Sequence, residues 1–127
     1  NSGNVKDGLV DLFRLDYEND NDVDVKRIIA WGYLVNCKPN DAERVYDWIV
    51  NSDRAIDSDW LNCGYVKFIL SKTAEAVRCF QRFVEQNEAT GQRELLKREL
   101  ANDWKILSKN GVKDYEAHLI VDIVMTK

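Results

Sequence analysis

Apolar residues recur three and four positions apart through most of this chain, and that spacing predicts amphipathic α-helices. The period runs through residues 5–15, through two stretches within 22–54, through two more within 57–90, and through two within 93–127. No stretch predicts a strand. The pattern therefore predicts one all-α domain over residues 1–127, with about seven helices and no strands.

Residues that favour turns separate the predicted helices. Residues 16–21 are rich in Asp and Asn, whose side chains compete for backbone hydrogen bonds. Pro39 ends one helix and can open the next, because it lacks an N–H donor and restricts the residue before it. Asp57 or Ser58 is expected to cap the following helix.

The last quarter of the chain predicts two longer helices. An apolar stripe made by Leu96, Leu100, Trp104 and Leu107 runs through residues 93–109 and predicts one continuous helix. Asn110 and Gly111 end it, because both tolerate the left-handed backbone conformation. A final helix is expected after Asp114 as its cap, with Tyr115, Leu119, Ile120, Ile123 and Val124 on its apolar face.

Residues of matching size recur 34 positions apart. Gly64 falls on Ala30, Ala76 on Ala42, and Phe80 on Tyr46. Small residues let two helices approach closely, while the large residue one turn away fills the space beside them. The positions expected to pack the repeats together are Ala30, Ala42, Tyr46, Trp60, Gly64, Ala76 and Phe80.

This period and these residues resemble the tetratricopeptide repeat, a helix–turn–helix unit with the pattern W-x2-L-G-x2-Y, then A-x3-F, then proline. The chain departs from that pattern at Lys26, Arg54, Lys67 and Glu88. The amino-acid sequence of residues 15–19 and 59–62 is similar to that of a bacterial branch of the family. The resemblance implies repeats over 22–54 and 57–90, a solenoid truncated at its N-terminus so that 5–15 is an orphan repeat helix, and a capping helix pair over 93–127.

The same resemblance implies a concave groove lined by the first helix of each repeat. The residues it places there are Arg27, Trp31, Leu34, Leu61, Tyr65 and Phe68. The implied function is a noncatalytic scaffold or adaptor that binds a protein or peptide in this apolar groove. Two alternatives stay open. The helix carrying Trp104 can cover the groove within the same chain, or the chain is a structural or regulatory domain of a larger protein whose activity lies upstream.

Composition excludes several other classes of protein. The 127 residues carry a net charge of −4, which opposes nonspecific binding to nucleic acid. Apolar residues at 45% and charged residues at 31% are ordinary for a globular domain. No run of about 18 apolar residues indicates a membrane segment.

The chain offers little material for catalysis or metal binding. The single histidine, His118, cannot build a metal site alone, and no nucleophile or phosphate-binding motif occurs. The three cysteines, Cys37, Cys63 and Cys79, show no metal-binding spacing and are odd in number, which favours a reducing cytoplasm. We therefore expect no catalytic residues, no metal and no cofactor.

Overall fold

The computed structural model describes residues 22–86 and 91–126, and all regular structure within them is helical. In chain order the helices are α2 (Val23–Val35), α3 (Pro39–Val50), α4 (Asp57–Ile69), α5 (Thr73–Glu85), α6 (Gln92–Asn102), α7 (Trp104–Lys109) and α8 (Asp114–Thr126). The predicted all-α class is confirmed, and no strand occurs in these residues. The helix expected over 5–15 lies outside the described residues.

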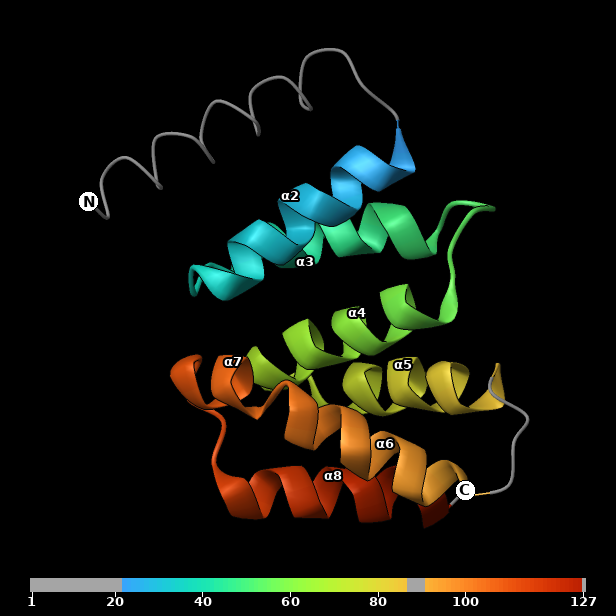
Figure 1. Ribbon diagram of the computed structural model, residues 1–127, viewed down its shortest axis with the longest axis vertical. Helices are drawn as coiled ribbons and strands as arrows, with labels where there is room; N and C mark the ends of the chain where they lie inside the picture. The colour runs from blue at the N-terminus through green and yellow to red at the C-terminus, as the bar shows by residue number, and fades with distance from the viewer. Residues whose placement is uncertain (1–21, 87–90, 127) are drawn as a thin grey trace.

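Helices that follow one another in the chain form pairs, and the pairs stack along the long axis of the molecule (Figure 1). α2 packs on α3 and α4 packs on α5, each over an extensive contact, while α3 joins the first pair to α4. α5 then contacts both α6 and α8. The identification of this stack as a tetratricopeptide-type solenoid stays a prediction. None of the helices in the described part of the chain is long and apolar enough to cross a membrane.

The same turn closes α2, α4 and α7. The residues Cys37, Ser71 and Gly111 all adopt the left-handed conformation, with φ of 59°, 63° and 96°. The residue after each of them donates its N–H to the carbonyl five positions earlier, from Lys38 to Tyr33 at 2.9 Å, from Lys72 to Lys67 at 2.8 Å, and from Val112 to Leu107 at 3.0 Å. This bonding pattern satisfies carbonyls that a helix end leaves free. α7 and α8 are thus joined in the same way as the two earlier pairs.

The start of α4 differs from the sequence expectation. Asp57 and Ser58 lie inside or at the edge of the first helical turn, and the residue before the helix is Ile56. The backbone N–H of Ile56 donates to Asp59 Oδ2 at 3.0 Å. The carboxylate of Asp59, in the first turn, thus accepts from the free N–H of Ile56, and neither Asp57 nor Ser58 fills this role. Asp114 is likewise the first residue of α8 and not its cap.

The single helix expected over 93–109 is two helices. α6 ends at Asn102 and α7 begins at Trp104, with Asp103 outside both. The carboxylate of Asp103 accepts a hydrogen bond of 2.7 Å from the Tyr65 hydroxyl, which holds this junction against α4. Because Leu96, Leu100 and Leu107 are all buried, the apolar stripe continues across the break, and its spacing alone does not reveal it.

Small residues mark the closest contact between α4 and α5. A Cβ atom added to Gly64 would lie 2.6 Å from Cε1 of Phe80, so no larger residue fits there without displacing the ring. Three predicted packing alanines, Ala30, Ala42 and Ala76, are fully buried, as are Tyr46 and Phe80. Trp60 is only half-buried, and the Arg82 guanidinium lies 4.7 Å above its ring.

Candidate functional site

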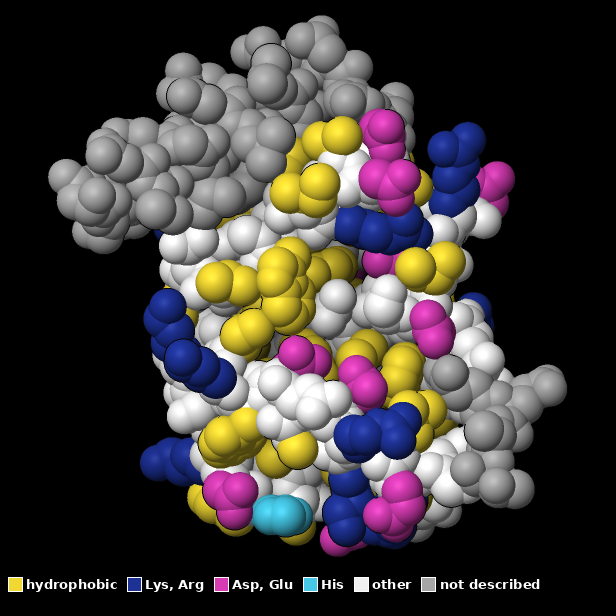
Figure 2. Space-filling model, in the orientation of Figure 1, with side chains coloured by type: hydrophobic (Ala, Val, Ile, Leu, Met, Phe, Trp, Pro, Cys, Tyr) yellow, Lys and Arg dark blue, Asp and Glu magenta, His cyan; other side chains and the backbone are white. Residues whose placement is uncertain are grey.

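The groove predicted from the sequence is partly filled by the chain itself. Leu34, Leu61 and Tyr65 are buried, whereas Trp31 and Phe68 are half-buried. Figure 2 shows hydrophobic side chains gathered over α2 and α4 on the viewed face. An apolar surface therefore remains there, but three of the six predicted positions belong to the core.

The C-terminal helices supply the contacts that close this region. The Tyr65 hydroxyl reaches the carboxylate of Asp103 at 2.7 Å, at the junction of α6 and α7. Asn110 donates from Nδ2 to the carbonyl of Leu34 at 3.1 Å, where α2 ends. Burial and then the bond to Asp103 raise the pKa of Tyr65, which keeps its hydroxyl protonated as a donor. Residues of the C-terminal helices thus contact two of the six positions predicted for the groove.

Arg27, the one charged residue predicted in the groove, is held in an internal ion pair. Its Nη2 lies 2.8 Å from Asp59 Oδ2, and its Nε lies 2.9 Å from Asp59 Oδ1. It also bonds Asp24 at 2.8 Å and the carbonyl of Arg54 at 2.9 Å. The hydrogen bond to Asp59 raises the pKa of the guanidinium. Because Asp59 is 1% exposed, Arg27 neutralises a buried charge between α2 and α4.

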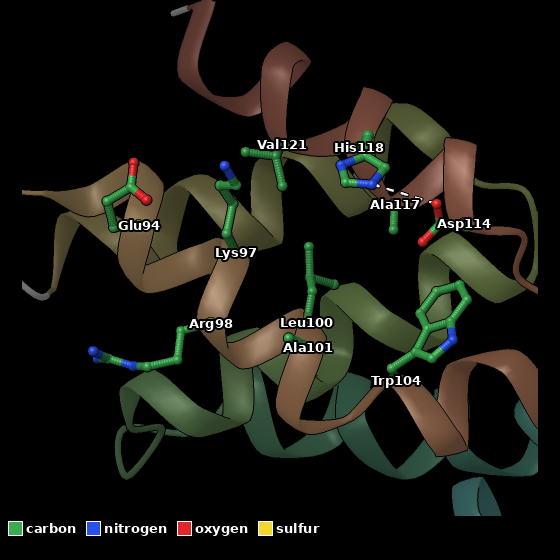
Figure 3. A pocket seen from close by; sticks show the side chains of 10 residues that line it. All are labelled: Glu94, Lys97, Arg98, Leu100, Ala101, Trp104, Asp114, Ala117, His118 and Val121. Carbon is green, nitrogen blue, oxygen red and sulfur yellow. Dashed lines mark ion pairs between the residues drawn. The ribbon is translucent and has the colours of Figure 1, made fainter.

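A pocket of about 600 Å³ opens between α6 and α8, and we call it the α6–α8 pocket (Figure 3). The residues that line it are Glu94, Lys97, Arg98, Leu100, Ala101, Trp104, Asp114, Ala117, His118 and Val121. α6 and α8 pack less closely on each other than α4 and α5 do. The pocket is the space that this looser packing leaves.

The α6–α8 pocket has an apolar middle and a charged rim. Leu100, Ala117 and Val121 lie between the two helices in Figure 3, and the Trp104 ring stands at one end. Charged side chains of both signs surround them. Such a surface suits one or a few apolar side chains of a ligand, with polar groups around them to fix orientation.

The rim carries the only histidine of the chain, at the start of α8. His118 Nε2 lies 3.4 Å from Asp114 Oδ2, and both side chains are largely exposed, at 71% and 81%. An exposed pair of this kind contributes little to stability. Among the described residues, no three side chains of His, Cys, Asp or Glu are placed to hold a metal ion.

Sequence reasoning missed the α6–α8 pocket because the repeat pattern fails there. A 34-residue shift places Arg98 where the small Gly64 lies, so the sequence predicted a capping helix pair over 93–127 and not a third repeat. The left-handed Gly111 aligns this segment with the earlier turns at Cys37 and Ser71 better than the 34-residue shift does. The sequence did contain one signal for a hollow between these two helices. It is the pair of small residues Ala101 and Ala117, one on each helix.

A second apolar surface lies on α8. Tyr115, Leu119 and Ile123 follow one another at four-residue intervals and are 61%, 53% and 44% exposed, although the sequence pattern placed all three on the packing face. Ile120 and Val124, from the same predicted face, are buried. The helix is apolar around more of its circumference than its packing uses.

No protein-family model, no curated protein and no solved structure matches this chain.

Proposed function

We propose that this chain is a noncatalytic protein- or peptide-binding module of the tetratricopeptide type, a scaffold or adaptor whose partner docks in the α6–α8 pocket. The observation that carries the proposal is the pocket itself, an apolar hollow of about 600 Å³ at a helix pair that its own chain leaves loosely packed. The 34-residue recurrence of small packing residues and the repeated turns at Cys37 and Ser71 support the repeat type.

The pocket favours a partner segment with one or two large apolar side chains. Its middle excludes a polar ligand, because burying polar groups against Leu100 and Val121 without hydrogen bonds is costly. Lys97 and Arg98 on one helix, with Asp114 on the other, suit flanking charges of both signs. A net charge of −4 disfavours nucleic acid as the partner. The absence of metal and cofactor, and a cytoplasmic location, belong to the same proposal.

The test uses a displayed library of random peptides selected on the full chain, with one substitution inside the pocket and one outside it. Ala101 lines the pocket and Ala74 lies exposed on α5, so Ala101→Glu and Ala74→Glu make the same chemical change at two exposed helix positions. We expect selected peptides with an aromatic or large aliphatic anchor, binding Ala101→Glu at least about tenfold more weakly than Ala74→Glu. Equal binding to both variants would show that the peptides use another surface.

The exposed stripe of Tyr115, Leu119 and Ile123 favours a second candidate function. A structural or regulatory domain of a larger protein needs an apolar face that packs against the rest of that protein. In that case the library yields no peptide that depends on the α6–α8 pocket. Substituting Leu119 with Lys then leaves the isolated chain folded but weakens its docking to the upstream domain.

A further inference from the structure

Two thiols lie beside the closest contact between α4 and α5. Cys63 directly precedes Gly64, and Cys79 directly precedes Phe80, the two residues that make this contact. The approach that Gly64 permits brings α4 and α5 close together here, and both cysteines line one pocket. Both are free thiols, with 1% of Cys63 and 6% of Cys79 exposed.

The thiol pair lines a second pocket, of about 440 Å³, which we call the thiol pocket. It is lined by Asp47, Val50, Asn51, Trp60, Cys63, Lys67, Glu75, Arg78, Cys79, Gln81, Arg82 and Glu85. Of the two cysteines, Cys79 is the more accessible from this opening, at 6% exposed against 1% for Cys63. Large oxidised partners such as proteins are excluded by its size.

A buried ammonium group lies one helical turn from Cys63. Lys67 is 6% exposed, and its Nζ lies 2.8 Å from Glu43 and 3.0 Å from Asp47, with Glu75 at 3.5 Å. Asp47 also lies 4.0 Å from the Cys63 sulfur. Lys67 thus brings a fixed positive charge to the base of the thiol pocket, among three carboxylates.

The two thiols have different acidities. The hydrogen bond from Cys63 lowers the pKa of Cys79, and Lys67 lowers it further, while burial, Asp47 and Glu75 oppose the shift. The same hydrogen bond, followed by burial, raises the pKa of Cys63. A thiolate is the reactive form of cysteine, and Cys79 is also the more exposed of the two, so Cys79 is the better placed nucleophile.

We propose that Cys63 and Cys79 form a reactive dithiol that small hydroperoxides oxidise to a disulfide between α4 and α5, with Cys79 as the attacking thiol and Cys63 as the resolving thiol. Nothing in the α6–α8 pocket enters this reaction, so it is independent of partner binding. The ligand class is hydrogen peroxide and other hydroperoxides small enough to enter the thiol pocket.

The reaction proceeds in two steps. The Cys79 thiolate attacks one oxygen of hydrogen peroxide, an S–O bond forms, the O–O bond breaks, and the departing hydroxide takes a proton and leaves as water. Cys63 sulfur then attacks the Cys79 sulfenic acid, an S–S bond forms, the S–O bond breaks, and the thiol proton of Cys63 leaves with the hydroxide as a second water. Two electrons pass from the sulfurs to the peroxide.

The test is peroxide oxidation of the full chain carrying Cys37→Ser, which removes the exposed cysteine. We expect the loss of both remaining thiols, a mass decrease of two hydrogens, and a Cys63–Cys79 linked peptide after proteolysis. Adding Cys63→Ser should stop the reaction at a Cys79 sulfenic acid, which dimedone traps. Adding Cys79→Ser should slow peroxide consumption by roughly tenfold or more, because the remaining thiol is the less acidic one.

Circular dichroism of each variant shows whether it is folded, and Cys63→Ala and Cys79→Ala replace any serine variant that is not. The proposal is overturned if the folded Cys37→Ser chain keeps both thiols under peroxide that oxidises free glutathione. It is also overturned if dimedone labels Cys63 in the Cys79 variant as fast as it labels Cys79 in the Cys63 variant.

Discussion

α4 and α7 end at the same kind of turn, but the helix pairs on either side pack differently: α4 packs closely on α5, the second pair, whereas α6 and α8, the third pair, pack loosely. In the second pair Gly64 and Phe80 leave no room even for a methyl group. In the third pair the facing helices leave a pocket of about 600 Å³. The same connection therefore produces either a closed contact or an open one, and the side chains between the helices decide which.

The residue seven positions before each left-handed turn residue differs in size between the helices. This residue is Ala30 on α2, Gly64 on α4 and Trp104 on α7. The absence of a side chain at Gly64 lets α4 and α5 close on each other, whereas the indole of Trp104 lines the α6–α8 pocket.

The largest difference in stability loss between the pairs should come from truncating Phe80, the large residue that faces Gly64. Phe80→Ala should destabilise the protein by about 3–5 kcal/mol, because it empties a closed contact. Val121→Ala, on α8 beside the pocket, should cost no more than about half of that, because fewer atoms are removed and the site is less closely packed. Urea denaturation measures both. Equal losses would mean that the third pair is as tightly packed as the second.

Replacing an alanine with leucine should lower the stability in the second helix pair, and raise it or leave it unchanged in the third. Ala76 is fully buried, so Ala76→Leu should overpack α4–α5 and cost about 1–3 kcal/mol. Ala117 is also buried but lines the α6–α8 pocket, so Ala117→Leu should be neutral or stabilising. Thermal unfolding of the two variants compares them directly. A loss of stability in Ala117→Leu equal to that in Ala76→Leu would contradict an open third pair.

Two buried tyrosines should differ in what their hydroxyls contribute. The Tyr65 hydroxyl bonds the Asp103 carboxylate, so Tyr65→Phe should cost about 1–2 kcal/mol by loosening the third pair from α4. The Tyr46 hydroxyl is buried without a hydrogen-bond partner in the described structure, so Tyr46→Phe should change stability by less than about 0.5 kcal/mol. Chemical denaturation of both variants tests this, and a costly Tyr46→Phe would reveal a partner for that hydroxyl.

The smallest effect concerns pH. Burial by itself would raise the pKa of the Glu43 carboxyl, but the hydrogen bonds from Lys67 and Lys72 lower it below 4.5. A depressed pKa in the folded state stabilises the protein above the unfolded value and loses that stabilisation as pH falls. The stability difference between the native chain and Glu43→Gln should therefore shrink below about pH 4.5. Gln92→Ala, at the contact between the second and third pairs, is the control and should show no such trend.

The periodic parts of the fold were predictable from the sequence, and the nonlocal polar contacts were not. The starts of α2, α3 and α5 and the turn at Gly111 follow from helix spacing, Pro39 and residues that tolerate left-handed backbone. The pairing of Arg27 with Asp59 and of Lys67 with Glu43 joins residues on different helices, and no spacing rule reports it. Lys67 stands where the tetratricopeptide pattern has a different residue. Arg27 stands where that pattern implies an open groove, so the sequence analysis assigned it to ligand binding.

The site was harder to predict for a physical reason. A pocket forms where two helices do not pack closely. The apolar stripe of α6 and α7 has the same spacing whether α8 packs closely on it or not. What separates the two outcomes is how closely α8 lies against α6. The break between α6 and α7 at Asp103 is not visible in the spacing either, because the hydrogen bond of Asp103 is to Tyr65 on another helix.

The hydrogen bond from Asn110 to Leu34 joins the last pair to the first and bypasses the second. In stacks where each unit touches only its neighbours, the ends fray independently and unfolding spreads stepwise. Here the third pair cannot detach without also breaking a contact of α2, which couples the two ends of the array. The chain should therefore lose its structure in one cooperative transition, with amide hydrogens of α2 and α7 exchanging at similar rates.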